Sequence, residues 1–203
     1  MAKILYIVSN PKPTDKSVSR QLGSEFIQEY KKENPNDEVV EIDLYKMEIP
    51  ELDSEVLNFR NGASVTNLDV LTKANQISYF TEQFIDCDKY VFVTPLWNLG
   101  LPAKTKAYID TICIAGKTFK YSPTGVQGLL QNKKCLHIHS SGGFHSKDPQ
   151  NHADGYLKDI MSFLGVRDYN SIIAEGHQAI PDQAEEIINS AKARIPEIIT
   201  WFS

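Results

Sequence analysis

Two serine hydroxyls close a loop near the N-terminus in a pattern that could hold an anion. The segment SNPKPTDKSVS (9–19) places Ser17 and Ser19 where a helix is expected to begin. The free N–H groups and the dipole of a helix start favour negative charge, and serine hydroxyls can add hydrogen bonds to it. An ordinary serine N-cap has the same residues, so this segment by itself leaves both interpretations open.

The same loop excludes the two best-known phosphate-binding motifs. It contains neither G-x-G-x-x-G nor G-x-x-x-x-G-K-[ST], and Pro11 and Pro13 do not fit a dinucleotide-binding turn. We therefore predict neither a classical dinucleotide fold nor a P-loop NTPase.

A second loop, PLWNLGLP (95–102), carries large apolar side chains where a connector is usually polar. Leu96, Trp97 and Leu99 could pack against a flat apolar ligand. Backbone N–H groups near Asn98 could bond to the polar edge of that ligand. A satellite hydrophobic cluster or a dimer contact is the alternative interpretation.

A third loop, SSGGFH (140–145), has two adjacent glycines. Gly142 and Gly143 would let the backbone approach a flat ligand closely and offer N–H donors. His145 could face the same site and act as a helper in catalysis. A simple strand-to-helix turn followed by a surface histidine is the alternative.

Histidine and cysteine spacing predicts no metal site. His137 and His139 share one strand face, but a metal ion would need more ligands at suitable spacing. Cys87, Cys113 and Cys135 are far apart and form no C-x-x-C pair, so we expect buried thiols without a disulfide framework.

Composition is that of a globular protein. The chain has 203 residues, of which 41% are hydrophobic and 23% charged, and we expect one domain over residues 1–203. A net charge of −5 argues against nucleic-acid binding. No apolar run approaches the roughly 20 residues of a membrane span. The start MAKILYIVSN is too short for a secretory signal, and we expect a cytoplasmic protein.

Strand-like and helix-like segments alternate along the chain. Nearly continuous apolar runs are typical of strands covered on both faces, and apolar residues at four-residue steps are typical of amphipathic helices. The expected strands are 3–8, 38–44, 89–94, 134–140 and 168–175. The expected helices are 19–33, 68–87, 102–113, 155–165 and 182–202, the last bent or restarted at Pro196. Two insertions, 45–67 and 116–133, interrupt the alternation.

This alternation predicts an α/β protein with a doubly wound, five-stranded parallel sheet and helices on both faces. In the strand order 2-1-3-4-5, strands one, three and four are neighbours. Ligands of such sheets bind outside the carboxyl ends of the strands, where the strand order reverses. The three loops described above follow those three strands, so we expect them to form one continuous site.

Several motifs together resemble the FMN-dependent NADH azoreductases, also described as NADH:quinone oxidoreductases. The resemblance covers nearly the full length of the chain. It rests on SVS at the end of the first loop and on PLWNLGLP, where the family shows P-x-[YW]-N-x-x-[IL]-P. The segments AGKTFKY, SSGGFH and FLG add to it. The resemblance implies a flavodoxin-like fold that binds FMN tightly.

Carried over position by position, the resemblance implies three groups of FMN-binding residues. The phosphate would be held by Ser17, Val18 and Ser19. The isoalloxazine would be lined by Pro95, Leu96, Trp97, Asn98 and Leu99. Its polar edge would be contacted by Ser140, Ser141, Gly142 and Gly143. Many relatives have arginine at the position of Ser141, so this chain lacks any contact that depends on that guanidinium.

The resemblance also implies the reaction and the assembly. NADH, the co-substrate, would give a hydride to flavin N5, and a quinone or an azo compound would then take its place and be reduced. The flavin sites would lie at the interface of a homodimer. Two other classes stay open from the residues alone: a flavodoxin-type electron carrier without a nicotinamide site, and a flavodoxin-like regulator without a ligand.

Overall fold

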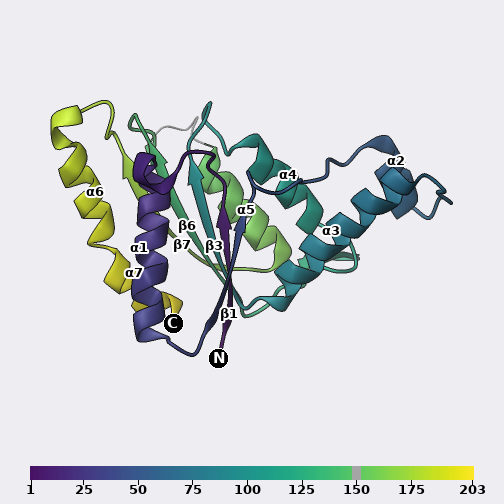
Figure 1. The fold of residues 1–203 in the computed structure, drawn as a ribbon. Coiled ribbons are helices and arrows are strands. Elements are labelled where there is room, and N and C mark those ends of the chain that lie inside the picture. The colour runs from purple at the N-terminus through teal and green to yellow at the C-terminus, as the bar shows by residue number, and fades with distance from the viewer. Residues whose placement is uncertain (148–151) are drawn as a thin grey trace.

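A five-stranded parallel sheet forms the centre of the protein (Figure 1). The computed structural model describes residues 1–147 and 152–203. The strand order is β2-β1-β3-β6-β7, and each neighbouring pair is parallel. The strands are β1 (Lys3–Val8), β2 (Glu38–Asp43), β3 (Lys89–Pro95), β6 (Lys134–Ser141) and β7 (Asp168–Glu175). Counted within the sheet, this is the predicted order 2-1-3-4-5, which is confirmed.

Helices cover both faces of the sheet, as Figure 1 shows. One face carries α1 (Val18–Glu33), α6 (Ala184–Lys192) and α7 (Ile195–Phe202). The other carries α3 (Leu68–Asp86), α4 (Ala103–Ile112) and α5 (Ala153–Leu164). Successive side chains of a strand point to opposite faces. In β1, therefore, Ile4 and Val8 pack toward α1 while Leu5 and Ile7 pack into the core beneath α3 and α4.

Both insertions contain regular elements that the sequence analysis did not assign. Helix α2 (Ser54–Arg60) lies within 45–67, and the carboxylate of Asp53 caps it by accepting a hydrogen bond from the backbone N–H of Val56 at 2.9 Å. The segment 116–133 forms the antiparallel hairpin of β4 (Phe119–Ser122) and β5 (Gly125–Gly128). Neither element is long enough for its hydrophobic period to stand out.

The ends of two helices agree with local signals in the sequence. Gly165 follows α5 with a φ of +105°, a left-handed conformation that glycine adopts without steric cost. The predicted closing helix is divided, because α6 ends at Lys192 and α7 begins at Ile195. Pro196 therefore occupies the first turn of α7, where its missing N–H needs no partner.

Among the described residues, the helices are either too short or too polar to cross a lipid bilayer.

Candidate functional site

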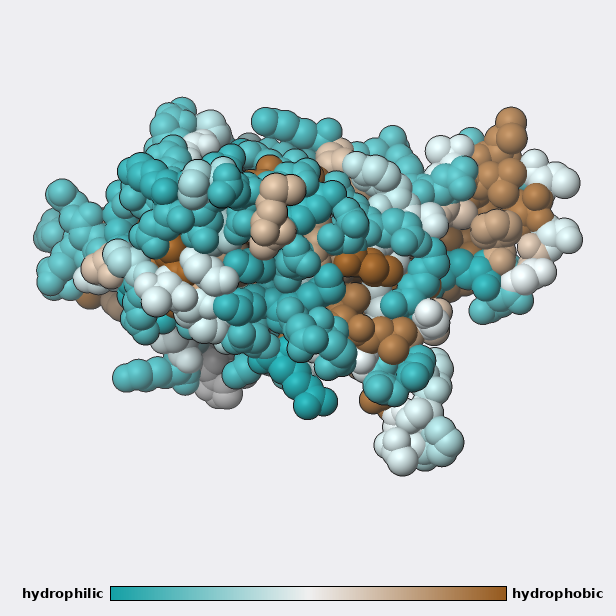
Figure 2. Space-filling view, turned by 90° about the horizontal axis from the view of Figure 1, so that it is seen from below, coloured by the Kyte–Doolittle hydropathy of each residue, from teal (hydrophilic) through white to brown (hydrophobic). Residues whose placement is uncertain are grey.

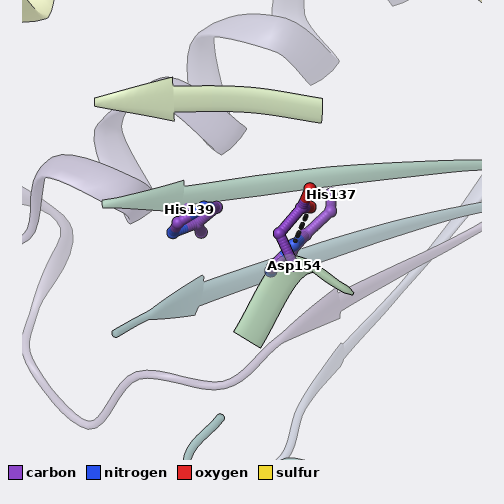
Figure 3. Close-up of side chains that lie close together, drawn as sticks. All are labelled: His137, His139 and Asp154. Atoms are coloured by element: carbon purple, nitrogen blue, oxygen red, sulfur yellow. Dashed lines mark hydrogen bonds and ion pairs between the residues drawn. The ribbon is translucent and has the colours of Figure 1, made fainter. Parts of the chain in front are cut away.

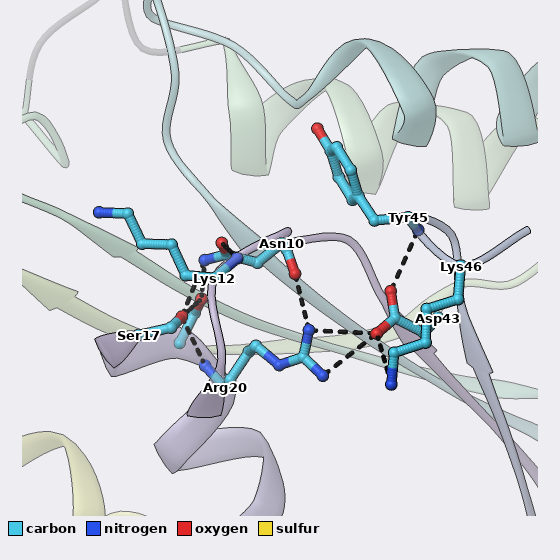
Figure 4. Close-up of polar contacts among 8 residues, drawn as sticks. Asn10, Lys12, Ser17, Arg20, Asp43, Tyr45 and Lys46 are labelled. Atoms are coloured by element: carbon cyan, nitrogen blue, oxygen red, sulfur yellow. Dashed lines mark hydrogen bonds and ion pairs between the residues drawn. The ribbon is translucent and has the colours of Figure 1, made fainter. Parts of the chain in front are cut away.

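The loop after β1 is organised around Ser17, the N-cap of α1. The Ser17 Oγ accepts a hydrogen bond from the backbone N–H of Arg20 at 3.3 Å. The Asn10 side chain donates to the same Oγ at 2.8 Å and reaches the Ser19 Oγ at 3.4 Å (Figure 4). Both serines are buried. The N-cap interpretation is correct for Ser17, and it keeps this hydroxyl beside the free N–H groups that favour an anion.

Arg20 anchors this loop to the end of the neighbouring strand β2. Its guanidinium donates to the backbone carbonyl of Asn10 at 2.7 Å and to the Asp43 carboxylate at 3.2 Å (Figure 4). Asp43 also accepts from the backbone N–H of Tyr45 at 3.0 Å. Because the Arg20–Asp43 pair is largely buried, Arg20 stabilises the loop as a structural residue.

The loop after β3 makes a tight turn that positions Trp97. Trp97 and Gly100 exchange backbone hydrogen bonds of 3.0 and 2.9 Å around Asn98 and Leu99. These two central residues have positive φ angles of 50° and 64°. Asparagine tolerates this left-handed conformation, whereas leucine is strained in it. The Trp97 ring remains 37% exposed and meets the edge of the Tyr45 ring, with centroids 6.2 Å apart.

The loop after β6 is held by the loop that follows β7. The backbone N–H of Gly176 donates to the carbonyls of Ser141 and Gly143 at 3.1 and 3.0 Å. The backbone N–H of Gln178 donates to the carbonyl of Gly142 at 3.1 Å. A Cβ on Gly142 would lie only 2.4 Å from the Gln178 Oε1, so a larger residue here would displace the Gln178 side chain.

His145 lies at the outer end of this loop. Its backbone N–H and that of Ser146 each donate to the Glu175 carboxylate at 2.7 Å. Burial raises the pKa of Glu175, but hydrogen bonds from Ser146 and His145 outweigh it and hold that pKa below its usual range. Glu175 therefore ties the predicted helper residue to the end of β7.

One pocket of about 330 Å³ opens where the three predicted loops meet. It is within the size range of small-molecule and cofactor sites. The predicted residues that line it are Ser17, Val18, Pro95, Leu96, Trp97, Ser140, Ser141 and Gly142. The prediction that loops from β1, β3 and β6 form one continuous site thus agrees with the geometry.

Four predicted residues are not among those that line the pocket: Ser19, Asn98, Leu99 and Gly143. Ser19 is fully buried behind Ser17, with its Oγ 3.3 Å from the Ser17 Oγ. Asn98 and Leu99 form the turn that orients Trp97, and Gly143 follows the lining residue Gly142. His145 also lies outside the lining.

Sequence reasoning missed five residues that line the pocket: Asn10, Lys12, Lys16, His177 and Gln178. His177 and Gln178 belong to the loop after β7, whose position follows from the strand order, because β7 is the neighbour of β6. Burial lowers the pKa of His177, and the nearby charge of Lys12 adds to this effect, so the imidazole is neutral at pH 7.

The pocket has three regions of different chemistry. Lys12 and Lys16 bring positive charge to the end formed by Ser17 and the start of α1. Leu96 and Trp97 supply an apolar wall, and Ser140 to Gly142 supply a polar edge. An anionic tail, a flat apolar body and a hydrogen-bonding rim are the features of a ligand that would match all three.

Comparison with known families gives the class of protein. Residues 2–199 match the model of a family with the flavodoxin-like fold, and the chain belongs to this family.

Two full-length relatives share one enzyme name. The FMN-dependent NADH:quinone oxidoreductase of Geotalea uraniireducens (strain Rf4) is 50% identical over 210 residues, with full coverage of both chains. The protein of the same name from Staphylococcus aureus (strain bovine RF122 / ET3-1) is 48% identical over 209 residues, again with full coverage of both chains. The predicted resemblance is confirmed: the chain belongs to the FMN-dependent NADH:quinone oxidoreductases.

Solved structures of azoreductases have the same fold as this chain. The azoreductase from Bacillus anthracis str. Sterne superposes with a TM-score of 0.91 at 35% identity, over 98% of this chain and 99% of that one. An FMN-dependent NADH-azoreductase from Bacillus anthracis str. Ames Ancestor, solved in complex with FMN, gives a TM-score of 0.91 at 32% identity. That alignment covers 98% of both chains.

Proposed function

We propose that this chain is an FMN-dependent NADH:quinone oxidoreductase that also cleaves aromatic azo compounds to amines. The enzyme class and the cofactor predicted from the sequence agree with the names of its full-length relatives. The observation that carries the proposal is the pocket, where a cationic helix start, an apolar wall and a polar edge converge.

The residues at the cationic end fit the phosphate of FMN. Ser17 offers a hydroxyl at the N-terminus of α1, and Lys12 and Lys16 line the same end of the pocket. The helix start, the hydroxyl and the two ammonium groups all favour a dianion. Val18 and Ser19, the first two residues of the helix, complete this group: Val18 lines the pocket, and Ser19 supports Ser17 from behind.

The rest of the pocket fits the isoalloxazine. Leu96 and Trp97, stiffened by Pro95, pack against its apolar body, and Asn98 and Leu99 hold the turn in place. The polar edge of the isoalloxazine is contacted by Ser140, Ser141, Gly142 and Gly143. FMN, when bound, supplies hydride acceptance from NADH at N5 and two-electron transfer to the acceptor. The backbone N–H groups of the glycine loop, and His145 nearby as the predicted helper, would stabilise negative charge at that polar edge.

Trp97 stands at the open side of the pocket, since its ring is more than one-third exposed. In this proposal NADH and the acceptor bind beside this ring in turn. Complete cleavage of an azo bond to two amines takes four electrons, so it requires two such turnovers.

Steady-state kinetics test this reaction. With NADH varied at several fixed concentrations of a benzoquinone, double-reciprocal plots are expected to be parallel, as in any mechanism in which the first product leaves before the second substrate binds. Decolourisation of an azo dye is expected to consume two NADH per bond cleaved. Turnover only with an added reductase protein would instead identify a flavodoxin-type electron carrier.

We also propose a homodimer with the FMN sites at its interface, formed in the cytoplasm from chains that each fold as one domain over residues 1–203. Apolar side chains gather at the end of the molecule where α2 lies (Figure 2). In this part of the chain, Leu57 on α2 is 42% exposed and Leu68 at the start of α3 is 76% exposed. Exposed apolar surface of this kind is typical of protein–protein contacts.

Light scattering tests the assembly. We expect the mass of a dimer, and we expect activity to fall when the holoenzyme is diluted far enough to dissociate. Full turnover by a monomer would contradict the shared site.

A further inference from the structure

Beneath the pocket, His137 joins the end of β3 to the start of α5. Its Nε2 lies 2.9 Å from the Thr94 Oγ1. Its Nδ1 lies 2.8 Å from the Asp154 Oδ1, the contact that Figure 3 shows. Thr94 and His137 have no exposed surface. Thr94 directly precedes Pro95, the last residue of β3, after which the loop that carries Trp97 begins. Asp154 is the second residue of α5.

Asp154 is fixed from a second direction by β7. The Tyr169 hydroxyl donates to the same Asp154 Oδ1 at 2.7 Å. Burial raises the pKa of Asp154, but the hydrogen bonds from His137 and Tyr169 outweigh burial and hold that pKa below its usual range. Asp154 is therefore an ionised carboxylate at neutral pH, and hydrogen bonds to a charged group are stronger than neutral ones.

The start of α5 in turn touches the loop that the proposed flavin needs. The backbone N–H of His152, which precedes α5, donates to the carbonyl of Leu99 at 3.0 Å. Leu99 and Asn98 have positive φ angles, a conformation that persists only where the surroundings over-determine it. The contact from His152 is such a restraint, and Asp154 holds the helix start that provides it.

We propose that Thr94, His137 and Asp154 are positioning residues that hold the loop 95–99 in its flavin-binding conformation. The inference rests on the proposed FMN function and adds residues that do not line the pocket. Thr94 fixes the loop where it leaves β3, and Asp154 fixes it through α5 at Leu99. A loop already in its bound conformation loses less entropy when the ligand binds.

A divalent metal ion is the competing interpretation of the same side chains. The His139 ring is nearly parallel to that of His137, with centroids 4.8 Å apart, and both of its ring nitrogens lack a partner in the described part of the chain. Potential ligand atoms of His137, His139 and Asp154 lie within 4.8 Å of one another. The hydrogen-bond network is favoured because both nitrogens of His137 are already engaged, with Asp154 and with Thr94.

The test compares Thr94→Val, which deletes the hydroxyl at constant shape, with Thr94→Ser, which keeps it. Thr81→Val is the matched control: Thr81 is equally buried, and its Oγ1 donates to the carbonyls of Ile77 and Thr111 in α3 and α4, away from the loop. The measurements are the FMN dissociation constant of the apoprotein, its thermal midpoint, and the visible circular dichroism of bound flavin.

We expect Thr94→Val to raise the FMN dissociation constant about tenfold, in line with the loss of a buried hydrogen bond, and to alter the flavin dichroism. Thr94→Ser should restore both within about twofold. Thr81→Val should lower the thermal midpoint by about as much as Thr94→Val does, and it should leave FMN binding unchanged. Asp154→Asn should resemble Thr94→Val, and the Thr94 variants decide the question even where this variant fails to fold.

Equal FMN affinity and dichroism in Thr94→Val and the wild type would overturn the inference while leaving the proposed function intact. One divalent ion per wild-type chain, lost in Asp154→Asn, would also overturn it, since the cluster would then be a metal site. A wild-type protein that binds no FMN would instead refute the proposed function itself.

Discussion

Replacing Ser17 with alanine should separate two roles that the structure gives to one hydroxyl. As the N-cap of α1, its Oγ accepts a hydrogen bond from the backbone N–H of Arg20. Loss of such a cap costs about 1 kcal/mol of stability, which lowers the melting temperature of a chain of this size by about 2–4 °C. As a ligand of the phosphate, the same hydroxyl makes a hydrogen bond to a charged group, worth about 1.5–3 kcal/mol.

Ser17→Ala should therefore raise the FMN dissociation constant about 10- to 150-fold. The assay is titration of apoprotein with FMN, followed by quenching of flavin fluorescence, together with a thermal melt of the apoprotein. Asn67→Ala is the control, because Asn67 caps α3 by accepting from the backbone N–H of Asp69 at 3.0 Å, outside the pocket lining.

The control should lose similar stability without losing FMN affinity. Ser19→Ala should weaken FMN binding less than Ser17→Ala, because Ser19 supports Ser17 from behind. An unchanged dissociation constant in Ser17→Ala, with a lowered melting temperature, would refute the assignment of the phosphate site and leave only the cap.

Three further predictions follow from other residues. Lys12→Met should raise the FMN dissociation constant several-fold at low salt and much less near 1 M salt, where exposed charges are screened. The control Lys32→Met, at the far end of α1, should leave the FMN dissociation constant unchanged at both salt concentrations. Trp97→Ala should lower kcat/KM for a benzoquinone about tenfold, because the partly exposed ring lines the pocket. An unchanged kcat/KM would contradict its placement at the opening. Burial raises the pKa of Cys87 and of Cys113 to about 11, so about one thiol in a thousand is ionised at pH 8. Iodoacetamide should therefore react slowly with both thiols until the chain is unfolded. Rapid alkylation of the native protein would contradict this prediction.

The sheet could be predicted because its strands are buried on both faces. β1 and β3 appear in the sequence as nearly unbroken apolar runs, and their carboxyl-end loops, one with Ser17 and one with Trp97, then meet at one edge. Helix α2 and the hairpin of β4 and β5 escaped prediction because they are short, and because tertiary contacts of residues such as Val56 and Phe119 stabilise them.

Predicted site residues line the pocket where their loops face it directly. The predicted contacts of Asn98 and Leu99 with the flavin stay predictions. Their positive φ angles, which form the turn that positions Trp97, could not be predicted because the turn contains no glycine at these two positions. His177 and Gln178 were missed because the loop after β7 has an ordinary composition. The role of Asn10, which bonds to Ser17 across seven residues, depends on a fold of the loop that spacing does not encode.

Anaerobic reduction of the bound flavin by NADH tests the central claim most directly. The purified protein with FMN should be yellow, and one equivalent of NADH should bleach its visible absorption before any acceptor is added. A benzoquinone should then restore the colour at once. A flavin that NADH leaves oxidised, and that bleaches only with an added reductase protein, would contradict the account, because the pocket would then serve an electron carrier.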